Sequence, residues 1–177
     1  MTTDNNLNGR VHAYVGNGKG KTTAACGLMM RTAGYGKLAV MVQFLKKRQT
    51  GESMFAGWTN NIVIRQFGTE DFYRPGKSDI LLYRRLCRQG LDFAIEKAVD
   101  ASLIVLDEVL DAVDYGLIVI DDLFYLLHDC TLNGTEIILT GRKVDDTLAN
   151  HCDLITEMTS VRHYYDKGIS AREGVEF

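Results

Sequence analysis

The 177-residue sequence has a single proline, four scattered cysteines and no long apolar run. Cys26, Cys87, Cys130 and Cys152 form no Cys-x-x-Cys pair, so their spacing predicts neither a zinc site nor a disulfide framework. No stretch approaches the roughly 20 apolar residues that a membrane-spanning helix needs, and nothing resembles a signal peptide. We therefore expect a cytoplasmic protein that has no membrane partner.

The sequence also lacks a strong charge bias. Its formal net charge is -3 and it contains no basic cluster, which argues against nucleic acid as a partner. With 46% hydrophobic residues, the chain is long enough for one α/β domain with a full core and too short for two ordinary domains. We expect residues 10–177 to form this domain and the polar, aperiodic residues 1–9 to form a flexible tail.

A glycine-rich motif, GNGKGKTT at residues 16–23, lies between a short apolar run and a helix-like segment. This order is typical of a phosphate-binding P-loop, in which backbone N–H groups and a helix N-terminus face a polyphosphate. In such a loop Lys21 neutralises phosphate charge and the Thr22 hydroxyl binds Mg²⁺. The loop is one residue shorter than usual, so we expect the phosphates in a different register from that of a standard ATPase. The predicted phosphate-binding residues are Gly16, Asn17, Gly18, Lys19, Gly20, Lys21, Thr22 and Thr23.

An acidic pair follows a second apolar run. Residues 103–106 are apolar and lead into Asp107 and Glu108. This pattern is typical of a Walker B motif, whose carboxylate meets the Mg²⁺ held at the P-loop hydroxyl. We therefore predict Thr22, Asp107 and Glu108 as metal-binding residues, and Lys21, Thr22 and Glu108 as catalytic residues. The alternative is an acidic pair that only begins a helix.

Apolar runs alternate with helix-like segments along the whole chain. This alternation predicts one P-loop domain with a mostly parallel, recombinase-like sheet and helices on both faces. The run at 38–44 is apolar almost throughout, which indicates a strand buried on both sides. The expected strands are 11–15, 38–44, 62–67, 103–106, 136–140 and 154–158. The expected helices are 24–30, 78–99 and 121–128, with Ser78 as the N-cap and Leu81 in the apolar stripe of the second, and residues 49–61 are expected to form a loop.

Several other residues follow the expected strands, at the edge where open α/β sheets bind ligands. Lys46 begins a Lys-Lys-Arg run, and we predict that it faces phosphate or an acidic substrate; the alternative is a solvated charge run. Arg142 follows the strand 136–140 and suits a phosphate clamp. Phe72 and Tyr73 lie in a long loop, where they either face a large flat ligand or pin the loop to the core.

Taken together, the motifs resemble those of the corrinoid adenosyltransferases of the BtuR/CobA/CobO type, including the shortened P-loop. The resemblance implies transfer of the 5′-deoxyadenosyl group of ATP to the cobalt of a reduced corrinoid, cobalamin or a precursor, with release of tripolyphosphate. It also implies Mg²⁺ at Thr22 and Glu108 with Asp107 nearby, an electron-donating reductase such as a flavoprotein, and a homodimer. The matching blocks are Gly16–Ala25 with Gly27 and Arg31, Gly34-x-Gly36-Lys37, Gln43-Phe44-x-Lys46, Leu106–Glu108 with Ala112, Leu139–Arg142, Asp153–Met158, Arg162-His163 and Gly168–Phe177.

One block departs from the family pattern. Many members carry Gly-x-Gly-Phe-x-Trp, whose aromatic residues are associated with displacing the lower ligand of the corrinoid, whereas this chain has Gly68-Thr69-Glu70-Asp71-Phe72-Tyr73. We expect Phe72 and Tyr73 to take that role and to contact the corrinoid. Two other functions remain as alternatives, namely a P-loop ATPase or nucleoside kinase, which would release ADP, and a regulator that binds its ligand without turnover.

Overall fold

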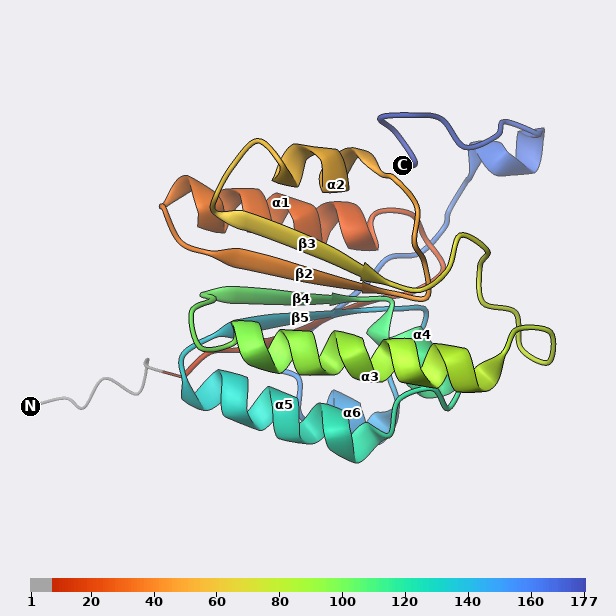
Figure 1. The fold of residues 1–177 in the computed structure, drawn as a ribbon. Coiled ribbons are helices and arrows are strands. Elements are labelled where there is room, and N and C mark those ends of the chain that lie inside the picture. Colours follow the sequence, from red (N-terminus) through yellow and green to blue (C-terminus); the bar gives the residue numbers. More distant parts are fainter. Residues whose placement is uncertain (1–7) are drawn as a thin grey trace, which may run out of the picture.

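A sheet of six parallel strands forms the centre of the protein. The computed structural model describes residues 8–177, so residues 1–7 of the expected tail lie outside the described residues. The order across the sheet is β3-β2-β4-β5-β1-β6, and the carboxyl ends of the strands meet at one edge, on the right in Figure 1. The strands are β1 (Val11–Val15), β2 (Ala39–Phe44), β3 (Ile62–Phe67), β4 (Leu103–Asp107), β5 (Glu136–Thr140) and β6 (Leu154–Glu157).

Helices cover both faces of this sheet, which confirms the predicted α/β architecture (Figure 1). On one face lie α1 (Lys21–Gly34) and α2 (Gly51–Ala56). On the other lie α3 (Ile80–Lys97), α4 (Val109–Asp114) and α5 (Ile120–Leu132). Two short helical turns, α6 (Asp146–Ala149) and η1 (Tyr164–Lys167), flank β6 in the sequence. No helix within residues 8–177 is both long enough and apolar enough to cross a bilayer.

Strand β2 shows why its sequence is apolar throughout. Ala39 and Met41 pack in the cluster under α1, whereas Val40, Val42 and Phe44 pack in the larger cluster under α3 and α5. All five side chains are fully buried, as expected for a central strand with helices on both faces. The two cores therefore fix which side of each strand faces which helix layer, and they leave the carboxyl edge of the sheet for polar groups.

Helix α3 departs from the sequence prediction at its start. Asp79, not Ser78, is the N-cap, because its Oδ1 accepts hydrogen bonds from the N–H groups of Leu81 (2.9 Å) and Leu82 (3.1 Å). The Ser78 hydroxyl instead accepts from the Arg74 N–H in the preceding turn. Leu81 is 71% exposed, so the prediction that it belongs to the buried stripe was wrong. The buried face is formed by Tyr83, Cys87, Gly90, Leu91, Phe93 and Ala94.

The sequence also predicted none of the short helices α4, α6 and η1, and two further segments differ from the prediction. The expected loop at 49–61 contains α2, which begins where the Thr50 N–H donates to Ser53 Oγ (3.0 Å). Gly9, assigned to the flexible tail from the sequence, donates its N–H to the Thr131 carbonyl (2.9 Å). A Cβ on Gly9 would lie 1.9 Å from the Thr135 carbonyl oxygen, so this residue belongs to the packed structure.

Candidate functional site

The P-loop connects β1 to α1 at the carboxyl edge of the sheet. Gly16 and Gly20 have φ angles of 108° and 120°, which side chains other than glycine rarely allow. The Gly16 N–H donates to the Arg142 carbonyl (2.9 Å) and the Gly18 N–H donates to the Met158 carbonyl (2.7 Å). The loop is thus held from both sides, by the residues that follow β5 and those that follow β6.

Met158 approaches the loop very closely. A Cβ on Gly16 would lie 2.3 Å from the Met158 carbonyl oxygen, and a Cβ on Gly18 would lie 2.6 Å from it. In the same region the Asn17 Oδ1 accepts from the Ser160 N–H (3.1 Å). The segment after β6 therefore forms the outer support of the P-loop, where Gly16 is required by contact and by its positive φ, and Gly18 by contact alone.

The two lysines of the P-loop are arranged differently. Lys21 Nζ donates to the carbonyls of Gly16 (2.7 Å) and Gly18 (2.8 Å), so it stays over the loop in which phosphate is expected. Burial lowers the pKa of Lys21 from its usual value. Lys19 points away from the loop, and its ammonium contacts Tyr164 and Glu176 near the end of the chain. Of the two predicted phosphate-binding lysines, Lys21 thus lies over the loop, whereas the Lys19 ammonium is bonded to residues near the end of the chain.

Asp107 lies at the centre of the polar cluster and is fully buried. Its Oδ1 accepts from the hydroxyls of Thr22 and Thr140, both at 2.8 Å. Its Oδ2 accepts from Lys46 Nζ (2.8 Å) and Gln43 Nε2 (3.3 Å). Burial alone would raise the pKa of Asp107, but the Lys46 charge and these hydrogen bonds outweigh it and hold the pKa below the usual range. The structure thus brings Thr22 to an ionised Asp107, as the two motifs predicted.

Lys46 joins the two acidic residues. Its ammonium lies 2.8 Å from Asp107 Oδ2 and 3.0 Å from Glu108 Oε1, and its side chain is only 11% exposed. Lys46 is therefore not part of a solvated charge run, although Lys47 and Arg48 beside it are exposed. Burial raises the pKa of Glu108, and the nearby Lys46 ammonium opposes this shift.

Two residues at this edge have a backbone conformation that is unusual for a side-chain-bearing residue. Leu45, which follows β2, has a φ of 64°, and Glu108, which follows β4, has a φ of 63°. The Glu108 N–H donates to Thr140 Oγ1 (2.8 Å). These left-handed residues turn the chain sharply at the ends of adjacent strands, which places the Lys46 and Glu108 side chains 3.0 Å apart.

Arg142 and the two loop aromatics were also predicted to bind ligand. Arg142 is exposed beside the P-loop, with its carbonyl bonded to Gly16. Phe72 is 52% exposed, and the Arg48 guanidinium lies 5.0 Å from the centre of its ring. The Tyr73 ring instead packs against Tyr83 (4.9 Å between centroids) and Tyr115 (5.3 Å), so it attaches the loop to the core, as the alternative reading held.

Four polar residues of the cluster were not predicted as site residues. Gln43 is fully buried, donates to Asp107 and Glu52 (3.0 Å to the Glu52 Oε1) and accepts from Gln66. Thr140 donates to Asp107. Gln43 and Thr140 lie at the ends of β2 and β5, shortly before the predicted Lys46 and Arg142, which was a usable signal, whereas Glu52 lies on the helix that the sequence did not reveal.

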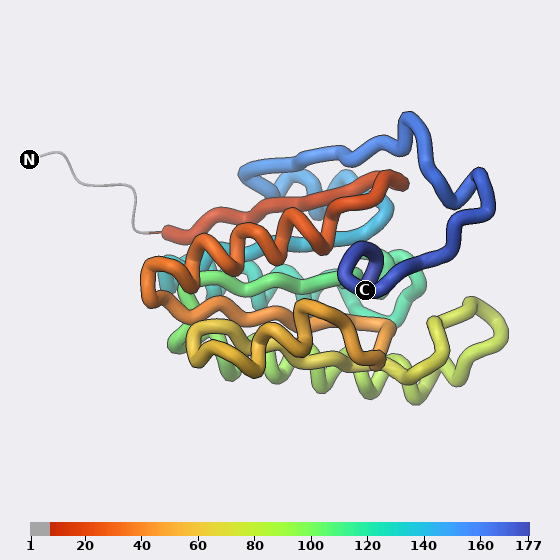
Figure 2. Tube along the Cα trace, turned by 90° about the horizontal axis from the view of Figure 1, so that it is seen from above, coloured from red at the N-terminus to blue at the C-terminus, as the bar shows by residue number. Residues whose placement is uncertain are grey.

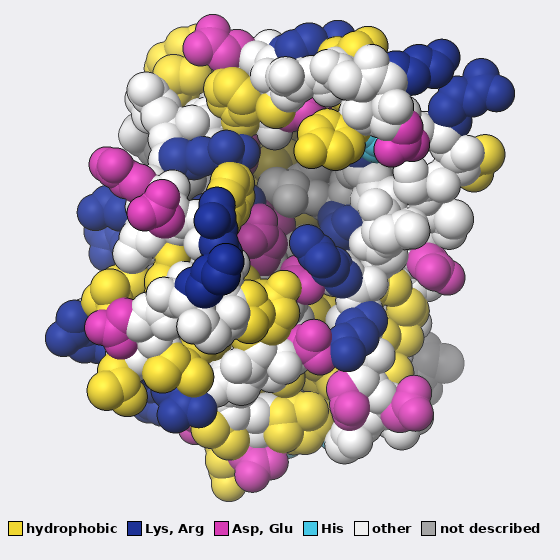
Figure 3. Space-filling model, turned by 90° about the vertical axis from the view of Figure 1, so that its right-hand side faces the viewer, with side chains coloured by type: hydrophobic (Ala, Val, Ile, Leu, Met, Phe, Trp, Pro, Cys, Tyr) yellow, Lys and Arg dark blue, Asp and Glu magenta, His cyan; other side chains and the backbone are white. Residues whose placement is uncertain are grey.

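A pocket of about 460 Å³ opens beside this cluster, between α1, α2 and the last residues of the chain. The volume lies within the range of small-molecule sites. The thiol of Cys26 lies in its wall, where burial raises the pKa to about 12 and keeps the thiol protonated. Figure 3 shows the carboxyl edge, which is hollowed near its middle, with Lys, Arg, Asp and Glu side chains gathered around the hollow. The lining residues are Thr22, Thr23, Cys26, Met29, Met30, Lys46, Arg48, Thr50, Gly51, Glu52, Phe55, Ile62, Ile64, Gly174, Val175, Glu176 and Phe177.

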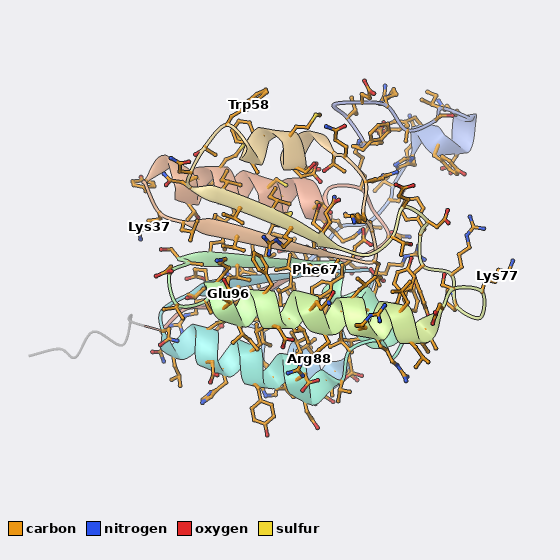
Figure 4. The ribbon with its side chains drawn as sticks, viewed as in Figure 1. Lys37, Trp58, Phe67, Lys77, Arg88 and Glu96 are labelled. Carbon is orange, nitrogen blue, oxygen red and sulfur yellow. The ribbon has the colours of Figure 1, made fainter. Side chains whose placement is uncertain are left out.

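Trp58 does not take part in this arrangement. It is 81% exposed and points away from the molecule beyond the end of α2 (Figure 4). Within residues 8–177, no group of three or more His, Cys, Asp or Glu side chains is arranged to hold a metal ion by itself. A cation at the Asp107 cluster would therefore need further ligands from a bound phosphate or from water.

Comparison with known proteins gives a consistent result. Residues 7–177 match the family described as ATP:corrinoid adenosyltransferase BtuR/CobO/CobP. A corrinoid adenosyltransferase of a Sinorhizobium species is 30% identical, over 100% of this chain and 84% of the relative. The corrinoid adenosyltransferase of Escherichia coli (strain K12) is 30% identical over 96% of this chain and 86% of the relative, and that of Pseudomonas aeruginosa is 31% identical over 93% and 81%.

Proposed function

The chain belongs to the ATP:corrinoid adenosyltransferase family BtuR/CobO/CobP, and from this membership we propose that it transfers the 5′-deoxyadenosyl group of ATP to the Co(I) of a reduced corrinoid and releases tripolyphosphate. The observation that supports this most directly is the hydrogen bond between Thr22 of the P-loop and the buried, ionised Asp107. It joins the phosphate loop to the acidic end of β4 in a single polar cluster.

The reaction needs no general acid or base from the protein. Co(I) supplies an electron pair to C5′ of ATP, a cobalt–carbon bond forms, and the C5′–O bond breaks with its electron pair remaining on the triphosphate. The protein must align the two substrates and stabilise the departing charge. Lys21 and the backbone N–H groups of Lys19 and Gly20 are the groups we assign to the triphosphate, with Arg142 at the exposed side of the loop, because the Gly16 and Gly18 N–H groups donate to protein carbonyls.

A divalent cation fits the same cluster. The Thr22 hydroxyl and the carboxylates of Asp107 and Glu108 are hard oxygen donors, which Mg²⁺ prefers, and Mg²⁺ is commonly held by one or two carboxylates together with phosphate oxygens. When bound there, Mg²⁺ would supply positive charge to the triphosphate. In the structure the Lys46 ammonium forms ion pairs with both carboxylates. We therefore infer that Lys46 moves away from at least one of them when the cation binds.

The corrinoid needs a larger and flatter surface than the pocket. We assign it to the exposed side of the loop after β3, where Phe72 presents its ring beside Arg48. Tyr73 serves this surface indirectly, because it attaches the loop to the core. Since Co(I) is formed from Co(II) by one electron, we further propose a reductase such as a flavoprotein as the electron donor.

The homodimer expected from the family remains a proposal, and β6 is the element that we assign to it. All four residues of this edge strand are exposed, with Leu154 at 45% and Ile155 at 44%. An edge strand with exposed apolar side chains is a ready surface for pairing with another chain. Light scattering of the wild type and Ile155→Lys tests this, because the proposal expects a dimer for the former and a monomer for the latter.

One assay tests the proposed reaction. ATP, Mg²⁺ and chemically reduced cobalamin are mixed with the enzyme under anaerobic conditions, while absorbance follows the corrinoid and chromatography identifies the phosphate product. We expect adenosylated corrinoid and tripolyphosphate in equal amounts, and neither with Lys21→Ala. Release of ADP without change in the corrinoid would identify an ATPase or kinase and overturn the proposal.

A further inference from the structure

The residues from Arg172 to Phe177 fold back onto the P-loop. Lys19 Nζ donates to the Val175 carbonyl (2.7 Å), to Glu176 Oε1 (2.6 Å) and to the Tyr164 hydroxyl (2.8 Å). An ammonium group has three N–H donors, so all three are in use. In Figures 1 and 2 the end of the chain lies near α2 and the amino-terminal end of α1. Lys19 therefore attaches this segment to the phosphate loop.

Glu176 is the acceptor that holds this attachment together. Besides Lys19, it accepts from the Arg172 N–H (2.7 Å), from the Arg172 guanidinium (3.3 Å) and from the Tyr164 hydroxyl. Its side chain is only 15% exposed. The hydrogen bonds from Lys19, Tyr164 and Arg172 lower the pKa of Glu176 well below its usual range. The carboxylate is therefore ionised at neutral pH and fixes the segment in one position.

The fixed segment forms one wall of the pocket of about 460 Å³. Gly174–Phe177 lie on one side of this pocket, and Thr22, Thr23 and Cys26 of α1 lie on another. The Phe177 ring is 5.3 Å from the guanidinium of Arg48, which also contacts Phe72. The pocket thus begins at the amino-terminal end of α1 and is closed by the last residues of the chain. The contact between Lys19 and Val175, 156 positions apart in the sequence, brings these two segments together.

Inside the pocket, one buried hydroxyl has no acceptor for its proton. Thr50 is 4% exposed and lines the pocket; its Oγ1 faces the Ser53 N–H in the capping box of α2, but it donates to none of the described residues. A buried hydroxyl without a partner costs free energy unless a ligand or water satisfies it. The remaining wall is largely apolar, with Met29, Ile62 and Phe55 on it. This combination suits the base and sugar of a nucleotide, which present flat apolar faces and a few hydrogen-bonding groups.

We propose that Glu176 is a positioning residue for ATP. By fixing Lys19, it holds Gly174–Phe177 as the wall of the pocket in which the adenosine part of ATP binds, with the Thr50 hydroxyl as a hydrogen-bonding partner. This inference rests on the proposed function only for the identity of the nucleotide. It also gives Lys19 a role different from phosphate binding, because its ammonium is used to fasten the wall.

A different role for Lys19 and Glu176 predicts the opposite change in ATP affinity when the Glu176 charge is removed. Lys19 could instead bind phosphate, with Glu176 competing for its ammonium. Removal of the Glu176 charge would then free Lys19 and tighten the binding of both ATP and inorganic tripolyphosphate. If Glu176 fastens the adenosine wall, its removal weakens ATP binding and leaves tripolyphosphate binding unchanged. Titration calorimetry with Mg²⁺ and either probe, in the absence of corrinoid, separates the two.

We expect Glu176→Gln to weaken ATP binding about fivefold and to change tripolyphosphate binding by less than about twofold. Lys19→Met should match it, and the double variant should be no worse than either single one, because both remove the same contact. At saturating ATP, kcat should stay within about twofold while the KM for ATP rises. The matched control is Glu96→Gln, which removes a carboxylate 2.7 Å from Lys97 on α3, far from the pocket (Figure 4).

Unchanged or tighter ATP binding by Glu176→Gln overturns the proposal, as does weaker tripolyphosphate binding by Lys19→Met alone. Deletion of Val175–Phe177 is a second test, which should weaken ATP binding more than either substitution while the thermal midpoint stays close to that of the wild type. The outcome is separable from the transfer reaction. An enzyme that fails to adenosylate Co(I), but whose Glu176→Gln variant binds ATP more weakly, would refute the proposed function and leave this inference standing.

Discussion

Replacement of Lys46 by Met tests the electrostatic account of the polar cluster. In the wild type the Lys46 ammonium compensates a fully buried Asp107 at 2.8 Å. Removing one partner of a buried ion pair typically costs about 3–5 kcal/mol. Asp107 keeps its hydrogen bonds from the hydroxyls of Thr22 and Thr140, so we expect the lower end of this range. For a chain of this size, about 3 kcal/mol corresponds to a fall in Tm of about 6–12 °C.

The sign of the pH dependence makes the prediction specific. In the wild type the pKa of Asp107 is lowered, so its contribution to stability is present above the unfolded pKa of about 3.9 and is lost as the pH falls through the folded pKa. Without Lys46, we expect burial to outweigh the remaining hydrogen bonds from Thr22 and Thr140 and to raise the pKa of Asp107 above the unfolded value. The destabilisation then disappears as the pH falls, so the difference between variant and wild type should shrink between about pH 7.5 and pH 5.

The measurement is urea unfolding of wild type and Lys46→Met at both pH values. Lys47→Met is the matched control, because Lys47 is the exposed neighbour in the same run and should have little effect. The double variant Lys46→Met/Asp107→Asn should regain part of the lost stability, since it no longer buries an unpaired charge. A loss that is the same at both pH values, or that the second substitution fails to relieve, would show that Lys46 stabilises the fold in another way.

Three further predictions concern the reaction. Thr22→Ala should lower kcat about 10²–10³-fold in the anaerobic transfer assay; near-normal turnover would remove Thr22 from the catalytic centre. Glu108→Gln should raise the Mg²⁺ concentration needed for half-maximal rate while corrinoid binding is unchanged, and an unaltered Mg²⁺ titration would argue against Glu108 as a ligand. Phe72→Ala should slow transfer that starts from Co(II) more than transfer from prereduced Co(I), because only Co(II) must lose its axial ligands. Equal rate losses in the two assays would show that the Phe72 ring only packs against the loop. Tyr73→Ala should instead lower Tm, because the Tyr73 ring attaches the loop to the core.

The inner strands were predictable because layers of helices bury them on both faces, whereas all four residues of the edge strand β6 are exposed. The runs at 62–67 and 136–140 were located to the residue; the central strand β5 is buried over 137–140, whereas the edge strand β3 carries the polar Arg65 and Gln66 and was recognised from its β-branched start. The hydrogen bond between Thr22 and Asp107 spans 85 positions, yet it was predictable because both motifs were assigned to the same bound cation. Motif chemistry can therefore locate a contact that local periodicity cannot.

Other parts of the site had no signal in the sequence. Helix α2 has six residues, too few to show a periodic apolar stripe, and it is stabilised by its packing beside β3. Glu52 could not be placed near Gln43 without it. The ion pair between Lys19 and Glu176 joins residues 157 positions apart, and neither flanking segment carries a pattern that selects the other. Such contacts follow from the path of the chain around the finished sheet, which local sequence does not encode.

At position 108, the left-handed backbone favours glycine for stability, whereas the proposed cation site needs the Glu108 carboxylate. A non-glycine residue in this region is destabilised by about 1 kcal/mol or more, which glycine would relieve. Selection for thermal stability alone should therefore enrich glycine or asparagine at position 108 and remove the carboxylate that Lys46 holds. Leu45 also has a positive φ, of 64°. Glycine there would relieve the backbone but would remove a core side chain that is only 4% exposed, so we expect selection for stability to keep Leu45. Laboratory evolution for heat resistance would thus erode the proposed cation site at Glu108 first and leave the neighbouring turn intact.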